Sequence, residues 1–195
     1  MDSMDSCCCS RRRVLAALLG AAATPLLTRR LEAAAASEPG SAAAPQTERW
    51  LELKNTHTGE SAKVIFRNAE GLVADALASL QHVLRDHRSG EQHEMDARLY
   101  DLLADLAARA GVEPRYEIIS GYRSPVTNAA LHERSTGVSS RSLHMEGRAI
   151  DVRLRGVDCA RLNELALAMG RGGVGYYASS RFVHLDTGRV RRWTG

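Results

Sequence analysis

Over most of the chain, the hydrophobic positions follow the two periods typical of strands and helices. Alternating hydrophobic residues over 49–66, interrupted by a polar turn that contains Gly59, predict a β-hairpin. Residues 72–88 carry hydrophobic side chains at helical spacing, and so does the segment from Leu99 to the helix-breaking Gly111. The pattern therefore predicts a hairpin followed by two helices.

Further along the chain, short predicted strands are interleaved with helices. The pattern predicts a strand within 116–124, a helix over 125–134, a strand over 147–154, a helix over 158–170 and two short strands within 172–188. The sequence contains no internal repeat, no P-loop and no dinucleotide-binding fingerprint. The predicted fold class is α+β, with helices packed against a small, mostly antiparallel sheet.

The N-terminal segment has a different pattern. The motif SRRR precedes an apolar stretch of about fourteen residues, which is shorter than the roughly 20 needed to span a membrane. This pattern is typical of a secretory signal peptide and resembles the twin-arginine export signal, with an uncleaved membrane anchor as the alternative. We expect residues 1–36 to be a twin-arginine-type signal peptide, 37–47 a linker, and 48–195 a periplasmic domain that has no membrane span after cleavage.

Charge and cysteine usage narrow the function classes. Most of the net charge of +3 lies in the first 36 residues, so the remainder is nearly neutral and gives no electrostatic case for binding nucleic acid. The basic C-terminal segment, with Arg189, Arg191 and Arg192, is expected to be a solvated rim. Cys159 is the only cysteine beyond the signal segment, and we interpret it as a structural thiol at a helix start, with a nucleophile as the alternative.

A histidine and an acid in one short segment point to specific chemistry. In SLHMEGRAIDV, His144 precedes Asp151, which lies between isoleucine and valine on a predicted strand. An acid buried there without a partner is costly. His184 and Asp186 share one face of a later strand. We interpret His144, Asp151 and His184 as three ligands of one Zn²⁺, with Gly147 allowing the chain to fold back, and a purely structural pair as the alternative.

Non-haem iron is the competing metal. The segment HLD at 184–186 matches one part of the two-histidine, one-carboxylate iron triad, but that triad needs another histidine downstream and none follows His184. The other five histidines lie in turns, loops or charged segments and are interpreted as solvated or capping residues. Zinc is therefore the preferred metal. Bound at this site, it would ionise a water near neutral pH for attack on a carbonyl.

Three segments, SGYRSP, SLHMEGRAID and FVHLDTG, together resemble the MepK-like (YcbK-like) murein endopeptidases. That family belongs with the D-Ala-D-Ala metallopeptidases and is related in fold to the zinc domain of hedgehog proteins. The resemblance covers residues 51–193. It implies that 48–195 is a zinc metallopeptidase domain that acts on peptidoglycan peptide stems and cleaves their cross-links, preferring links between two diaminopimelate residues. A D-Ala-D-Ala carboxypeptidase and a non-catalytic, zinc-bearing wall-binding module are the alternatives.

The resemblance also implies roles for single residues. It assigns zinc to His144, Asp151 and His184, and it assigns Arg123 to the scissile carbonyl as an electrostatic clamp. Ser142 and Tyr122 are expected to orient ligands or substrate, while Tyr176 and Tyr177 either line the site or pack in the core.

The general base departs from the family pattern. Many relatives carry an acid or a histidine two or three residues before the last zinc histidine, where this chain has Arg181 and Phe182. Asp186 is the best replacement because it shares the His184 face, and orientation of His184 is an equal alternative for it. Glu146 is a weaker candidate for the base.

Overall fold

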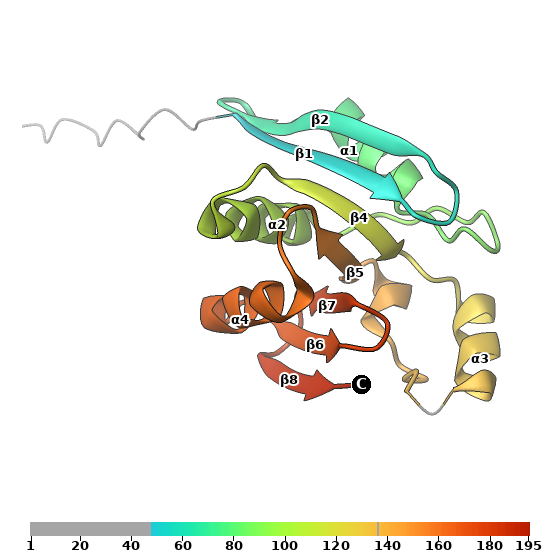
Figure 1. Cartoon of the computed structure of the whole chain (residues 1–195). Coiled ribbons are helices and arrows are strands. Elements are labelled where there is room, and N and C mark those ends of the chain that lie inside the picture. Colours follow the sequence, from blue (N-terminus) through green and yellow to red (C-terminus); the bar gives the residue numbers. More distant parts are fainter. Residues whose placement is uncertain (1–47, 136) are drawn as a thin grey trace, which may run out of the picture. The chain divides into compact units, whose positions relative to one another are not determined.

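The computed structural model describes residues 48–135 and 137–195, so the predicted signal peptide and linker lie outside the described residues. Within these residues, one eight-stranded sheet runs in the order β3-β2-β1-β4-β5-β7-β6-β8 (Figure 1). The pairs β1–β4 and β6–β8 are parallel, and the other pairs are antiparallel. The strands are β1 (Arg49–Asn55), β2 (Ser61–Asn68), β3 (Gly71–Leu72), β4 (Arg115–Ser120), β5 (Ala149–Leu154), β6 (Gly173–Tyr177), β7 (Phe182–Asp186) and β8 (Arg191–Thr194).

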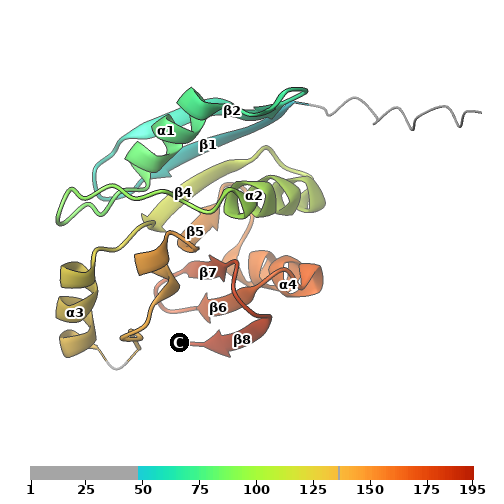
Figure 2. The same cartoon turned by 180° about the vertical axis from the view of Figure 1, so that it is seen from behind.

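Three of the helices in the described residues pack against the sheet. The helices are α1 (Ala74–Val83), α2 (Ala97–Ala110), α3 (Pro125–Arg134), α4 (Cys159–Met169) and the short 3₁₀ helix η1 (Leu143–Glu146). α1 packs against β1 and β2, α2 against β1 and β5, and α4 against β5, β6 and β7. α3 stands apart from α2 and α4 in both views (Figures 1 and 2). The predicted α+β class is confirmed.

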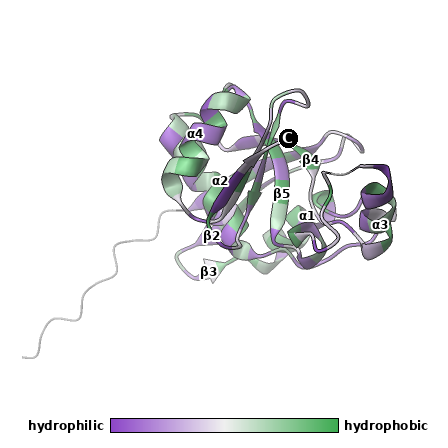
Figure 3. Ribbon diagram, turned by 90° about the horizontal axis from the view of Figure 1, so that it is seen from below, coloured by the Kyte–Doolittle hydropathy of each residue, from purple (hydrophilic) through white to green (hydrophobic). Residues whose placement is uncertain are grey.

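The helix boundaries follow capping chemistry. Asp96, Ser124 and Asp158 accept backbone N–H bonds at the starts of α2, α3 and α4. Gly111 and Gly170 end α2 and α4 in the left-handed conformation. Between these caps, α2 and α4 mix hydrophobic and hydrophilic residues as surface helices do (Figure 3).

Alternation along the central strands separates the core from the opposite face of the sheet. Ile150, Val152 and Leu154 of β5 join Val183 and Leu185 of β7 in the hydrophobic core, which also contains side chains of α2 and α4. Successive strand residues point to opposite faces. The residues between them, among which are the predicted metal ligands of these two strands, therefore face away from α2 and α4.

Two elements differ from the sequence prediction. The segment predicted as one helix over 72–88 instead begins with the last residue of the edge strand β3 and continues as α1, which ends at Val83. The sheet is also wider than the small sheet predicted, because β3 and the arginine-containing β8 add its two edges. The strand β8 was not predicted, since its polar sequence resembles a solvated tail.

Asp86 anchors the segment that follows α1. Its buried carboxylate accepts hydrogen bonds from the backbone N–H of Arg88, at 2.9 Å, and from the N–H and hydroxyl of Ser124, at 2.9 and 2.8 Å. Burial alone would raise the pKa of Asp86, but hydrogen bonding by the Thr127 side chain, together with the bonds from Arg88 and Ser124, lowers it below its usual range. This carboxylate therefore ties the segment after α1 to the start of α3.

None of the helices in the described part of the chain is both long and apolar enough to cross a bilayer.

Replacing Asp86 with alanine is expected to destabilise the protein by about 2–4 kcal/mol, because the N–H and hydroxyl of Ser124 would be left buried without an acceptor. Urea unfolding measures this change. Glu70→Ala, at an exposed position, is the control and is expected to stay within about 0.5 kcal/mol of the wild type. Equal stabilities of the two variants would contradict the proposed tie.

Candidate metal centre

The structure brings the three predicted ligands together from three elements. His144 lies in η1, Asp151 in β5 and His184 in β7. Asp151 and His184 are direct partners in the antiparallel β5–β7 pair, so their side chains emerge side by side. All three residues are buried. In the described residues, they form the only group of three or more histidine, cysteine or acidic side chains placed to hold a metal ion.

The ligand atoms face one another closely. Nδ1 of His184 is 2.8 Å from Oδ1 of Asp151 and 3.2 Å from Nε2 of His144. Nε2 of His144 is 3.4 Å from the same Asp151 oxygen. Two imidazole nitrogens and one carboxylate oxygen thus converge on one point, which is the donor set expected of a catalytic zinc site.

Hydrogen bonds on the outer sides of the two rings set the tautomers. Nδ1 of His144 is 2.7 Å from the carbonyl oxygen of Gly121, and Nε2 of His184 is 3.1 Å from Oδ2 of Asp186. A carbonyl and a carboxylate only accept hydrogen bonds, so these two nitrogens carry the protons. When each ring is neutral, the nitrogen that faces Asp151 then presents a lone pair. Three lone pairs at such distances repel one another unless a proton or a metal ion lies between them.

The pKa directions reflect burial and these contacts. Burial lowers the pKa of His144, which favours its neutral form. For Asp151, burial acts to raise the pKa, but the charges and hydrogen bonds of His144 and His184 outweigh burial and lower it below its usual range. Burial opposes protonation of His184 as well, yet hydrogen bonds to Asp151 and Asp186 raise its pKa. The acid is thus held as a carboxylate.

Gly147 provides the fold-back expected from the sequence. It ends η1 with φ +64°, a backbone conformation that favours glycine. A Cβ built on it would lie 2.1 Å from the carbonyl oxygen of Glu94. Close approach and conformation therefore both require glycine between His144 and Asp151.

Asp186 lies behind His184, on the side of the ring away from Asp151. Its buried carboxylate accepts hydrogen bonds from the backbone N–H groups of Gly173 and Gly188, at 2.9 and 2.8 Å, and from Nη2 of Arg191, at 2.7 Å. Burial would raise the pKa of Asp186, but its bonds to His184, to the two backbone groups and to Arg191 lower it. Arg191 is therefore half-buried and ion-paired, which corrects its prediction as a solvated rim residue; Arg189 and Arg192 are exposed.

Arg123 borders the cluster from the segment before α3. Its Nη2 is 3.7 Å from Oδ2 of Asp151, and its hydrogen bonds to Ser120 and Asn128 are both long, at 3.4 Å. The Nε atom is buried and has no hydrogen-bond partner among the described residues. Its backbone N–H donates to the carbonyl of His144. The guanidinium therefore lies beside the cluster with spare donor capacity.

A cleft of about 750 Å³ opens over the three ligands, and we call it the metal cleft. Tyr177 lines it, whereas Tyr176 lines a separate cleft and packs against the core. The residues at the family's base positions also separate, because Phe182 lines the metal cleft and Arg181 lines the other one. Sequence reasoning missed several lining residues that come from distant segments: Arg141, Arg148, Arg189 and Trp193.

The remaining candidates lie outside the metal cleft or support it. Glu146 pairs with Arg148 at 3.0 Å and is not among the residues that line the cleft. Ser142 caps η1 by accepting from the His144 N–H, while the ring of Tyr122 stacks on His93. Cys159 is half-buried at the start of α4, where burial raises the pKa of its thiol and disfavours the nucleophilic thiolate.

A cluster of two imidazoles and one carboxylate under an arginine-lined cleft is typical of metal-dependent hydrolases. Residues 42–193 match the family model described as Peptidoglycan L,D-endopeptidase MepK, one of the M15 peptidases. The chain thus belongs to the MepK family of peptidoglycan L,D-endopeptidases, which are metallopeptidases. This match confirms the family and the peptidoglycan endopeptidase activity predicted from the sequence motifs.

Individual relatives agree with the family match. The chain is 43% identical over 145 residues to Peptidoglycan L,D-endopeptidase MepK of Escherichia coli (strain K12) and of Shigella flexneri, covering 74% of this chain and 80% of each relative. It is 38% identical over 148 residues to the Probable peptidoglycan L,D-endopeptidase MepK of Haemophilus influenzae, covering 75% and 80%. No solved structure matches the chain significantly.

Gly147→Ala is expected to destabilise the protein by about 2–4 kcal/mol and to weaken zinc binding, because the clash with Glu94 displaces the turn that joins two ligands. Gly170→Ala is the matched control. Gly170 has nearly the same φ, +62°, but open space around the added Cβ. We expect it to cost only about 1–2 kcal/mol and to leave zinc affinity unchanged. Denaturant unfolding and zinc titration measure both effects, and equal losses would refute the close-approach argument.

Proposed function

We propose that this protein is a zinc-dependent murein endopeptidase that hydrolyses cross-links between two diaminopimelate residues of peptidoglycan. The observation that carries the zinc dependence is the convergence of His144 Nε2, Asp151 Oδ1 and His184 Nδ1. The other nitrogen of each ring faces an acceptor outside this cluster. The link specificity is carried by membership of the L,D-endopeptidase family and by a cleft that is rich in arginine.

The donor set fits zinc better than the other common metals. Two imidazoles and one carboxylate suit Zn²⁺, whereas Mg²⁺ and Ca²⁺ prefer oxygen ligands. Bound by His144, Asp151 and His184, zinc would supply Lewis-acid polarisation of the scissile carbonyl and a water whose pKa is lowered towards 7. Gly121 and Asp186 hold the two rings in the tautomers that such binding requires.

Arg123 supports catalysis as an electrostatic clamp. Its guanidinium is largely buried, with only 11% of the side chain exposed, and its donors are incompletely used. A preorganised, partly desolvated cation stabilises negative charge that develops on a carbonyl oxygen far better than a solvated one does. We propose that Arg123 stabilises the negative charge that develops on the oxygen of the scissile carbonyl.

Asp186 acts by orienting His184. Its carboxylate is bonded on four sides, by His184, Gly173, Gly188 and Arg191, and lies across the imidazole ring from Asp151. A general base must reach the proton that it abstracts. The placement of Asp186 behind the ring therefore favours the orienting role over the base role. We propose that Asp186 contributes to activity by orienting His184.

The fold and the location complete the proposal. We propose that the α+β domain is of the hedgehog and D-Ala-D-Ala-peptidase type, since its motifs resemble that group and its ligands lie on the sheet face opposite α2 and α4. Peptidoglycan lies outside the cytoplasmic membrane, and residues 1–36 have the pattern of a twin-arginine signal. We accordingly propose export by that pathway and action in the periplasm.

Digestion of purified sacculi tests the activity. We expect the protein to convert dimers linked through two diaminopimelate residues into monomers, as read by mass spectrometry of muropeptides. A chelator should abolish the conversion, and added zinc should restore it. Release of terminal D-alanine with intact dimers would instead indicate a carboxypeptidase. Dimers that persist with and without zinc would overturn the endopeptidase proposal.

Asp186→Asn separates orientation from general-base catalysis. We expect zinc affinity to fall by about 10–100-fold, while turnover at saturating zinc stays within about tenfold of the wild type and the pH–rate profile keeps its shape. Arg191→Gln, which removes a partner of the same carboxylate, should change zinc affinity in the same direction but less. An unchanged zinc affinity together with a loss of kcat above about 100-fold would identify Asp186 as the base.

A further inference from the structure

The metal cleft carries a marked excess of positive charge. Asp151 is the only carboxylate that lines it among the described residues, and the cleft is lined by five arginines: Arg123, Arg141, Arg148, Arg189 and Arg191. A cleft lined by one sign of charge concentrates ligands of the opposite sign. The cleft as a whole is therefore built for an anionic substrate.

Three of these arginines have carboxylate partners within the protein. Arg191 pairs with Asp186 at 2.7 Å, Arg148 pairs with Glu146 at 3.0 Å, and Arg123 lies 3.7 Å from Asp151. Each of these guanidinium groups already faces a negative charge. The positive charges of these three arginines are therefore balanced, at least in part, within the protein.

Arg141 and Arg189 differ from the other three. Within residues 48–135 and 137–195, their side chains make no ion pair and no hydrogen bond. Arg141 precedes η1, close to His144, and Arg189 follows β7, close to His184. Two arginines from separate segments thus line one cleft, each a few residues in sequence from a different proposed metal ligand. Arginine forks bind carboxylates in bidentate geometry.

An aromatic wall lines the same cleft. Nε1 of Trp193 donates a hydrogen bond to Oη of Tyr177 at 3.0 Å, and Tyr177 stacks on Phe182 with ring centroids 4.5 Å apart. Gly175 permits this arrangement, because a Cβ there would lie 2.5 Å from the Trp193 ring. The cleft therefore offers flat apolar surface together with free cations, which suits an aliphatic chain that bears carboxylates.

The proposed substrate has this chemistry. When the carboxyl group of one diaminopimelate residue is joined to an amino group of another, the carbon that bears the amide nitrogen keeps its own carboxylate. The leaving amine of the reaction thus carries a negative charge next to the scissile bond. The aliphatic chain of the same residue separates its two ends.

We propose that Arg141 and Arg189 bind the free carboxylate beside the scissile bond, and so determine the preference for links whose amino group comes from a diacidic residue. This inference rests on the proposed function. It makes the two arginines specificity-determining residues, distinct from the clamp at Arg123. Binding of a carboxylate that does not react contributes equally before and at the transition state, so its loss raises KM more than it lowers kcat.

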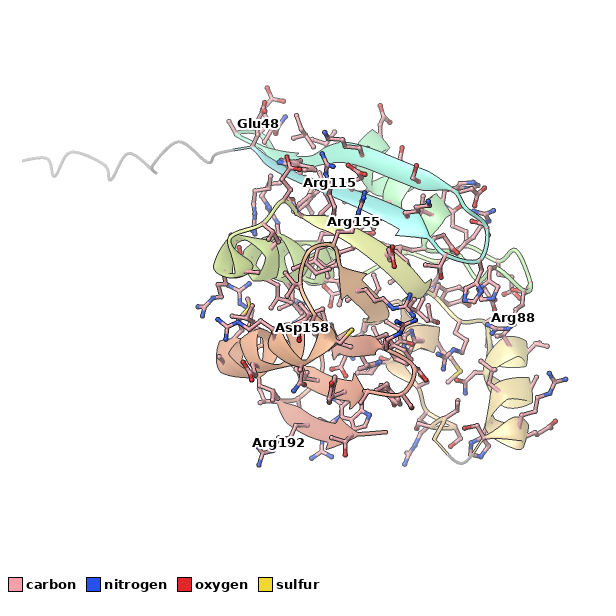
Figure 4. The ribbon with its side chains drawn as sticks, in the orientation of Figure 1. Glu48, Arg88, Arg115, Arg155, Asp158 and Arg192 are labelled. Atoms are coloured by element: carbon pink, nitrogen blue, oxygen red, sulfur yellow. The ribbon has the colours of Figure 1, made fainter. Side chains whose placement is uncertain are left out.

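The test measures how the full-length, zinc-loaded protein cleaves two synthetic muropeptide dimers. Both dimers contain the same scissile link, but in one the flanking carboxylate is converted to a carboxamide. We expect Arg141→Gln and Arg189→Gln each to lower kcat/KM for the carboxylate dimer by about 10–100-fold, mainly through KM, and to change it less than about threefold for the carboxamide dimer. Arg192→Gln is the control, because Arg192 is exposed at the outer side of β8 and does not line the cleft (Figure 4).

Equal losses on the two dimers, or no loss on either, would overturn the assignment of the arginines while leaving the endopeptidase activity intact. If the wild type cleaved neither dimer, the proposed function would fail instead. Calorimetric binding of the same dimers then decides the inference separately. A wild-type preference for the carboxylate dimer that disappears in both arginine variants supports the inference, and equal wild-type affinities for the two dimers overturn it.

Discussion

The burial of the Asp151 carboxylate is the constraint on which the site depends. The residue lies between two core side chains of β5, where a charged oxygen loses most of its hydration. The structure compensates with positive or polarised groups on every open side: His184 at 2.8 Å, His144 at 3.4 Å and Arg123 at 3.7 Å. A carboxylate in this position is stable only with a cation nearby, and a metal ion satisfies it and both imidazoles together.

The surrounding chain is arranged to keep these groups in place. Antiparallel pairing of β5 with β7 sets Asp151 beside His184, and the turn at Gly147 brings His144 onto them. Behind His184, Asp186 is anchored by strand β6 through Gly173 and by β8 through Arg191. A Cβ on Gly173 would come within 2.3 Å of the Asp186 carboxylate, so glycine is needed there. Hence strands β6 and β8, at the edge of the sheet, fix the geometry of the His184 ring.

The sequence predicted the features that depend on short-range pattern. Hydrophobic spacing and capping residues located α2, α3 and α4, and the His144–Asp151 spacing together with HLD at 184–186 identified the three residues that converge in the structure. What escaped prediction depends on distant partners. The helix after β3 ends before Asp86, whose carboxylate is bonded to the distant Ser124, and β8 is a strand because it pairs with β6 despite its polar sequence. The free arginines of the metal cleft come from separate segments, so no local motif contains both.

The placement of the groups around the cluster divides their tasks. In the proposed site, Asp151 and two imidazoles are the metal ligands, Arg123 offers donors beside them, and the aromatic wall with Arg141 and Arg189 forms the outer cleft. The central claim is that one zinc ion is held by His144 Nε2, Asp151 Oδ1 and His184 Nδ1. A crystal structure of the zinc-loaded protein, with anomalous data at the zinc edge, tests it most directly. The account predicts a single strong peak about 2.0–2.2 Å from these three atoms. A peak elsewhere, or a His184 ring turned to bind through Nε2, would contradict it.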